Sequence, residues 1–403
     1  MKSKLKSVLF ASMAFFLAIA LIRFPDQSLE ASIRGLSMWW EIVFPSLLPF
    51  FVTAELLIGF GVVRFIGILC EPIMRPIFKV PGVGSFVWAM GMASGYPSGA
   101  KLTARLREER HLTQIEAERL VSFTNASNPL FIFGAVSVGF FHDPKLGVLL
   151  AVSHYAGNAL VGVCMRFYGA NDSSTLEREQ PTFSLKKAFQ ALHETRMADG
   201  RPFGKMFGDA VLSSIQTLLV IGGFIILFSV FNKLLFMIGI TPIIAAGLSF
   251  FFQLAQLSPE LAIPFISGLF EITLGSQMTS KIEQIDLLQQ VLVVSFILAF
   301  NGFSVQAQVA SILAETDIRF TPYFFARVLH GCLAVVLSWL LFKPLYLDRD
   351  IAGTYEEPVF SEGESSSLLF DWFLWVGHIG PTVTLCSLFL AIIILYQRIE
   401  EKK

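Results

Sequence analysis

GMASGYPSGAKL, residues 91–102, and GLFEITLGSQMTS, residues 268–280, are two polar, glycine-broken segments inside otherwise hydrophobic sequence. An asparagine follows each segment, and a histidine follows each asparagine at the same interval of 29 residues. Interrupted hydrophobic segments at corresponding positions in two halves of a chain indicate the substrate site of a secondary transporter. The two intervals run from Asn125 to His154 and from Asn301 to His330.

The composition indicates a polytopic membrane protein. Of the 403 residues, 54% are apolar and 15% are charged, and the mean hydropathy is +0.65. The net charge of −1 and the lack of a basic cluster give no sign of a nucleic-acid partner. The cysteines are far apart in apolar sequence and predict neither a disulfide nor a metal framework. They are Cys70, Cys164, Cys332 and Cys386.

Several segments are long and apolar enough to cross a bilayer, which requires about 20 residues. The first follows a lysine-rich start and lacks a small-residue cleavage site, which predicts a retained signal-anchor helix. The eight candidate spans are residues 6–24, 39–63, 120–141, 145–168, 211–236, 287–313, 322–343 and 372–396.

Residues 82–105 and 260–281 are apolar on both sides of a centre rich in Gly, Ser, Thr and Pro. Pro97 and the glycines would break or weaken a straight helix, so both segments are predicted to be re-entrant helical hairpins. Irregular backbone at membrane depth is tolerated only inside protein or around a polar cavity. The predicted fold is therefore an all-α polytopic membrane protein, with about eight transmembrane helices and two re-entrant hairpins around a cavity.

The distribution of Lys and Arg gives the predicted topology. With the amino terminus in the cytoplasm, the loops assigned inside carry most of the basic residues, as the positive-inside rule requires. Three spans separate the hairpins, so the hairpins enter from opposite sides and the repeats are inverted. The predicted parts are the signal-anchor helix and loop (1–38), the first repeat (39–168), a cytoplasmic linker (169–206), the second repeat (207–343), an acidic flexible linker (344–371) and the last helix with its tail (372–403).

Two segments have two interpretations each. Residues 239–258 take the place that residues 64–80 take in the first repeat, and they form either an interfacial helix or a further span. The stretch after Ser184, LKKAFQALHETRM, repeats Leu and Phe at helical spacing. It forms either a helix on the inner leaflet or a solvated linker helix.

The hairpin tips are the predicted substrate contacts. A half-helix that starts inside the membrane points free N–H groups and the positive end of its dipole at the cavity, where an anion can bind. Tight packing of small residues is the alternative interpretation. The tip residues are Ser94, Gly95, Tyr96, Pro97 and Ser98 in the first hairpin and Glu271, Thr273, Ser276 and Gln277 in the second.

Glu271 is a carboxylate flanked by apolar residues, which is costly at membrane depth and predicts a functional role. It is expected to coordinate a coupling cation, carry a proton or pair with a basic group such as Arg327. A purely structural ion pair is the alternative.

Each hairpin is followed by a helix with a polar break. The breaks are FTNASNP, residues 123–129, and FNGFSVQAQ, residues 300–308. Free carbonyls and amides in such breaks suit a planar polar ligand or Na⁺. The candidate residues there are Asn125, Asn128, Asn301 and Ser304.

The histidines and the motifs that the sequence lacks limit the kinds of protein that this chain can be. A lone intramembrane histidine is more often a packing residue than a ligand, and no second metal ligand follows His154 or His330 at helical spacing. The chain has no P-loop, no H-E-x-x-H and no G-x-S-x-G, so an enzyme is not expected. The predicted partners are a small-molecule anion and the lipid bilayer, with no resident cofactor. Na⁺ and H⁺ are the candidate coupling ions, and an oligomer is compatible with these features.

The first hairpin motif, the FTNASNP break and the GLFEITLGS hairpin, in this order, resemble the YlbJ-type sporulation integral membrane proteins. That group lies in the nucleoside-recognition Gate superfamily and is similar to concentrative nucleoside transporters. The resemblance covers about residues 39–343. It implies a transporter-like fold in the outer forespore membrane that moves dipicolinic acid from the mother cell toward the forespore, in support of spore cortex formation.

The resemblance also places the hairpin tips and the asparagines of the breaks at the substrate. The first hairpin has Ser94 and Gly95 where nucleoside carriers typically have an acidic residue, which argues against a nucleoside and is compatible with a planar dicarboxylate. A nucleoside transporter and a non-transporting structural protein of spore assembly are the alternative functions.

Overall fold

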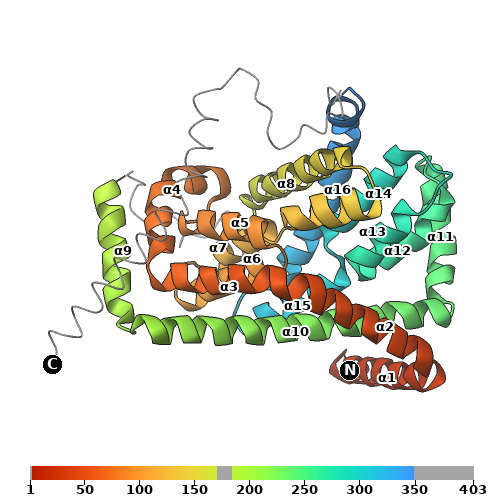
Figure 1. Ribbon diagram of the computed structural model, residues 1–403, viewed down its shortest axis with the longest axis horizontal. Helices are drawn as coiled ribbons and strands as arrows, with labels where there is room; N and C mark the ends of the chain where they lie inside the picture. The colour runs from red at the N-terminus through yellow and green to blue at the C-terminus, as the bar shows by residue number, and fades with distance from the viewer. Residues whose placement is uncertain (1, 170–183, 349–403) are drawn as a thin grey trace, which may run out of the picture. The chain divides into compact units, whose positions relative to one another are not determined.

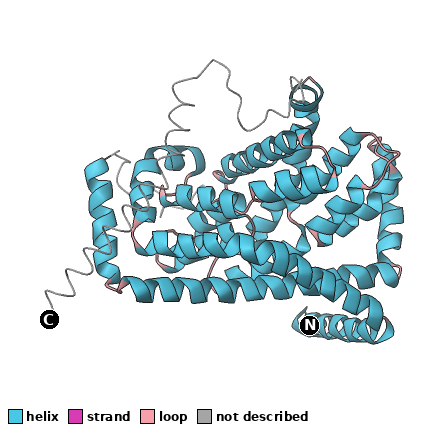
Figure 2. Ribbon diagram, viewed as in Figure 1, coloured by secondary structure: helices cyan, strands magenta, loops and turns pink. Residues whose placement is uncertain are grey.

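The computed structural model describes residues 2–169 and 184–348, and within these ranges the chain is helical with short connections and no strand (Figure 2). The predicted all-α class is therefore confirmed for the described residues. The predicted segments 344–371 and 372–403 lie almost wholly outside them.

The first half begins with helices that the sequence only partly predicts. Helix α2 occupies a stretch predicted to be a loop; Pro25 at its first position and Asp26 in its first turn are ordinary helix-start signals. A π turn, η1, joins it to α3, so the helical path reaches back well before residue 39. The elements are α1 (Lys2–Arg23), α2 (Pro25–Met38), η1 (Trp39–Val43), α3 (Phe44–Gly59), α4 (Val62–Phe78), α5 (Val83–Ser94), α6 (Ser98–Glu108), α7 (Gln114–Thr124), η2 (Leu130–Phe140) and α8 (Lys145–Met165).

The second half repeats the order of the first. A long helix is followed by a shorter helix, a helical hairpin, a broken helix and a second long helix in both halves. The elements are α9 (Leu185–Asp199), α10 (Phe203–Met237), α11 (Ile240–Leu254), η4 (Pro259–Leu261), α12 (Ala262–Phe270), α13 (Ile272–Ser280), α14 (Leu287–Phe300), α15 (Gly302–Leu313), α16 (Phe320–Phe342) and η5 (Lys343–Leu347).

Both predicted hairpin segments form two packed helices with a break between them. In the first, α5 and α6 are joined through Gly95, whose φ of 86° favours glycine. In the second, α12 and α13 are joined at the extended residue Glu271. Gly268 and Gly275 lie against each other where α12 and α13 meet, so the two arms approach more closely than larger residues would allow.

Both predicted helix breaks are present. Helix α7 ends at Thr124, and an irregular stretch leads to η2 at Leu130. Helix α14 ends at Phe300, and the next residue, Asn301, is left-handed with a φ of 64° before α15 starts at Gly302. Residues 120–141 are thus a broken element rather than one continuous helix.

Helices α2, α3 and α10 form a long scaffold beside the hairpins. Figure 1 shows α10 running along α2 and α3, with α4 and α9 at one end of α10 and α11 at the other. Helix α4 is bent by 81° from α3, so it lies across the direction of that helix. Helix α11 has 15 residues, about 22 Å at 1.5 Å per residue, which is short for a bilayer and favours the interfacial interpretation of residues 239–258.

Four described helices are long and apolar enough to cross a membrane, or five segments if the bent pair α3–α4 counts as one span. They agree with the predicted spans at 145–168, 211–236, 287–313 and 322–343. The hydrophobic core joins the two halves, since one buried cluster contains Leu120 and Phe123 of α7 together with Val309 of α15 and Ala326 of α16.

Candidate substrate site at the two helix breaks

The two helix breaks meet at one tyrosine hydroxyl. Asn125 Nδ2 donates to Tyr323 Oη at 2.8 Å, and Asn301 Nδ2 donates to the same oxygen at 2.6 Å. All three residues are 0% exposed. Tyr323 lies on α16 and was not predicted as a site residue, whereas both asparagines were.

The centre formed by Asn125, Asn301 and Tyr323 has hydrogen-bond acceptors that are not used. The amide oxygens Asn125 Oδ1 and Asn301 Oδ1 have no hydrogen-bond partner among the described residues. A buried acceptor without a donor is costly. The two oxygens can accept from a ligand or water, or coordinate a cation, so the breaks supply both donors and acceptors.

Arg327 of α16 closes the end of α7. Its guanidinium donates to the carbonyl oxygens of Asn125, at 2.8 Å, and of Ser122. Asn158 of α8 accepts from Arg327 at 3.0 Å and donates to the Phe123 carbonyl. These are carbonyls that a helix end leaves free, so Arg327 and Asn158 stabilise the break from two other helices.

The two histidines lie together behind the breaks. Their rings are 4.8 Å apart. His154 Nε2 accepts from the Ser127 backbone N–H at 3.0 Å, and His330 Nε2 donates to the His154 carbonyl at 2.8 Å. His330 Nδ1 lies 3.2 Å from Arg327 Nη1. The two histidines therefore pack against each other where α8 meets α16.

The tip of the first hairpin contacts both breaks. Ser94 donates to Ser98 Oγ at 2.6 Å, and Asn128 Nδ2 donates to the Ser94 carbonyl at 3.2 Å. Tyr96 Oη donates to the carbonyl of Leu298 in α14 at 2.5 Å. Gly95 lies against Asn128, and Pro97 precedes the start of α6. The structure thus brings the predicted first-hairpin residues together with both breaks.

In the second hairpin, Glu271 caps a helix. Its carboxylate accepts from the backbone N–H groups of Thr273, at 3.0 Å, and Leu274, at 2.7 Å. The predicted pairing of Glu271 with Arg327 is wrong, because Glu271 and Arg327 bond to different groups. The cation that lines the same cavity as Glu271, of about 30 Å³, is Arg34. The positive end of α13 is therefore already occupied by a carboxylate, whereas α6 starts without a side-chain cap.

The other second-half residues are dispersed. Gln277 lines the small cavity beside Glu271 and Thr273. Ser276 is 0% exposed, and its hydroxyl has no partner in the described part of the chain. Ser304 is buried on α15, three residues after Asn301.

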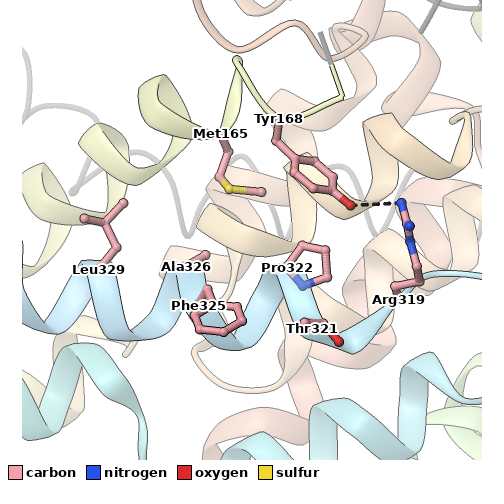
Figure 3. Close-up of a pocket in the computed structure, with 8 residues that line it drawn as sticks. All are labelled: Met165, Tyr168, Arg319, Thr321, Pro322, Phe325, Ala326 and Leu329. Atoms are coloured by element: carbon pink, nitrogen blue, oxygen red, sulfur yellow. Dashed lines mark hydrogen bonds between the residues drawn. The ribbon is translucent and has the colours of Figure 1, made fainter. Parts of the chain in front are cut away.

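Gln277 also lines a cavity of about 560 Å³ between η2 and the end of α13. Two further large cavities lie away from this centre. One, of about 510 Å³, lies between the end of α8 and the start of α16; it is mostly apolar, with Tyr168 and Arg319 at one end joined by a hydrogen bond of 2.9 Å (Figure 3). None of the predicted site residues lines it. The other, of about 330 Å³, is polar and lies between α3, α6, α10 and α15.

Paired hairpins and broken helices in apolar sequence define an integral membrane protein built from two repeats of one element order. The chain belongs to the Gate family, described as nucleoside recognition, whose profile matches residues 40–143 and 218–317. Each matched range contains one hairpin and one helix break. Over 401 residues the chain is 56% identical to the sporulation integral membrane protein YlbJ of Bacillus subtilis (strain 168), covering 99% of this chain and 98% of that protein. No solved structure matches the chain.

Proposed function

We propose that the chain is a secondary transporter or facilitator for a small planar organic anion. The observation that carries the proposal is the meeting of both helix breaks, one from each half, at the buried Tyr323 hydroxyl. A site shared by two repeats can be opened toward either side of the membrane when one part moves against the other, which is how alternating-access transporters work.

The first hairpin favours an anion. Helix α6 starts at Ser98 without a side-chain cap and carries Lys101 one turn later. Free N–H groups at a helix start and a nearby ammonium are both suited to a carboxylate. The hairpin also lacks the acidic residue that nucleoside carriers typically have. The resemblance to sporulation proteins suggests dipicolinic acid, moved from the mother cell toward the forespore across the outer forespore membrane.

The proposed topology has about eight transmembrane helices and two re-entrant hairpins in inverted repeats. It is supported by the repeated element order, by the placement of α4 and α11 at opposite ends of α10, and by the concentration of Lys and Arg in loops assigned to the cytoplasm. Na⁺ or H⁺ is the proposed coupling ion.

A thermal-shift panel on the detergent-purified full chain tests the substrate. Pyridine-2,6-dicarboxylate should raise the melting temperature, because a ligand that binds only the folded state stabilises it, by about 2.7 kcal/mol at a hundred times Kd. Adenosine and uridine should not. Asn125→Ala with Asn301→Ala should abolish the shift. A shift with nucleosides alone favours the nucleoside alternative, and no shift with any ligand favours a structural role.

A further inference from the structure

The polar cavity of about 330 Å³ joins the first hairpin to the scaffold and to the second half. Glu108 and Glu315 are exposed and lie at its rim, whereas Lys101, Glu55 and Gln308 are largely buried and lie inside. The cavity holds several charged groups and has the volume for a small organic molecule. None of these residues was predicted as a substrate contact.

Lys101 is the under-satisfied group in this cavity. Its Nζ is buried and makes no hydrogen bond within the described residues. Its nearest opposite charge is Glu55 Oε1 at 3.5 Å, and it lies 4.9 Å from the centre of the Phe51 ring. An ammonium has three donors, and a good ammonium–carboxylate hydrogen bond is about 2.7–2.9 Å long. The pair with Glu55 therefore leaves most of the capacity of Lys101 unused.

Glu55 is held weakly as well. Besides Lys101, Glu55 contacts the Ser213 hydroxyl, which donates to Glu55 Oε1 at 3.3 Å. Both the Glu55 and Lys101 side chains line the cavity and are 16% exposed, but Lys101 Nζ itself is covered, so a ligand reaches it by displacing Glu55. A carboxylate that approaches Lys101 at normal hydrogen-bond length can replace Glu55 as its partner.

Two residues of the cavity lie about one helical turn from residues of the hairpin tip and of the second break. Lys101 is three residues after Ser98 on α6, about 4.5 Å along the helix axis, and Gln308 is four residues after Ser304 on α15, about 6 Å. Helices α6 and α15 pack against each other. A ligand bound at Lys101 would therefore be one helical turn from the tip of the first hairpin.

We propose that Lys101 binds a carboxylate of the transported anion and that the anion takes the place of Glu55. This inference rests on the proposed function and adds to it the residue that holds a carboxylate of the substrate. Because Lys101 lies on the hairpin and Glu55 on α3, the exchange also removes one contact between the hairpin and the scaffold. The Lys101–Glu55 pair is thus the contact that an arriving substrate breaks.

Equilibrium binding tests this assignment. Radiolabelled pyridine-2,6-dicarboxylate is bound to the detergent-purified full chain and to two variants whose affinities should change in opposite directions. Lys101→Gln should lower the affinity by about tenfold or more, the size expected for loss of a charge-assisted hydrogen bond. Glu55→Gln should raise the affinity severalfold, because it removes the competing carboxylate. Lys187→Gln, on the exposed face of α9, removes the same charge outside the cavity and should bind like the wild type.

The outcomes separate this inference from the proposed function. If the wild type binds and both variants weaken binding, the pair is only a structural latch and the assignment is wrong. If Lys101→Gln does not give a monodisperse protein, the Glu55→Gln result decides alone, and binding no tighter than wild type overturns the assignment. If the wild type binds no dicarboxylate, the proposed function fails and this inference fails with it.

Discussion

At the residue scale, the central feature is the Tyr323 hydroxyl. Asn125 and Asn301 could be predicted because each follows a glycine-broken segment and begins an equal interval to a histidine. Tyr323 could not, because a single tyrosine in an apolar helix carries no signal of its position in space. The predicted pairing of Arg327 with Glu271 is wrong, because the sequence does not show which helix end the Arg327 guanidinium reaches.

Replacing Tyr323 tests whether this hydroxyl holds the two breaks together. Tyr323→Phe leaves two buried amides without a partner, and we expect a loss of about 1–3 kcal/mol in the free energy of unfolding, measured by denaturant titration in detergent. Tyr155→Phe is the matched control, because among the described residues the Tyr155 hydroxyl bonds to a single group, the Ser127 carbonyl, at 2.9 Å. Equal losses in the two variants would contradict the bridging role.

At the element scale, the hairpins were predictable and the ends of the scaffold helices were not. Glycine and proline in an apolar segment indicate a break directly, and α5–α6 and α12–α13 agree with that expectation. Helix α2 was missed because residues 25–38 are polar enough to resemble a loop. They become helical by continuing through η1 into α3 and by packing against α10.

Gly99 tests how the first hairpin packs on the first break. A Cβ at Gly99 would overlap the Thr124 carbonyl of α7, and backbone cannot move aside as a side chain can. We expect Gly99→Ala to destabilise the protein by about 1–3 kcal/mol, as overpacking does. Gly223→Ala in α10, where an added Cβ would have no neighbour within 4 Å among the described residues, should be neutral or stabilising by up to about 1 kcal/mol. A stable Gly99→Ala protein would mean that the hairpin does not pack this way.

The turn between α9 and α10 should make stability depend on acid pH. Asp199 accepts two hydrogen bonds from the Arg201 guanidinium, both of 2.8 Å. These bonds lower the pKa of Asp199 from 3.8 to about 2. A carboxyl whose pKa is lower in the folded state stabilises the fold above its unfolded pKa and loses that contribution as the pH falls.

The wild type should therefore lose more stability than Asp199→Asn between pH 4 and pH 2, the interval that the lowered pKa of Asp199 defines. Thermal denaturation of both proteins across this interval measures the difference. Parallel curves would show that the turn does not form this ion pair in solution.

At the scale of the whole molecule, the sequence indicated two related halves, and the matched family ranges each contain one hairpin and one break. The sequence does not show which helices of the two halves are in contact, because α8, α14 and α16 have apolar residues on every face and many pairings would bury them. The number of spans is also not defined by hydropathy alone. Helices α3 and α4 are continuous in hydropathy but are bent by 81° relative to each other, with the left-handed Gly61 between them.

The inverted topology predicts that α4 and α11 lie on opposite sides of the membrane. In a background without native cysteines, Arg64→Cys and Gln256→Cys introduce single thiols at exposed positions. A membrane-impermeant maleimide should label Gln256→Cys in intact cells and Arg64→Cys only after permeabilisation. Labelling of both from one side would contradict inverted repeats.

The most direct test of the central claim is flux through the reconstituted full chain. Proteoliposomes should take up labelled pyridine-2,6-dicarboxylate with saturation, and Asn125→Ala with Asn301→Ala should reduce the initial rate to that of protein-free liposomes. Labelled uridine should not enter above background. Dicarboxylate uptake no faster than in protein-free liposomes, or uptake of uridine alone, would contradict the account.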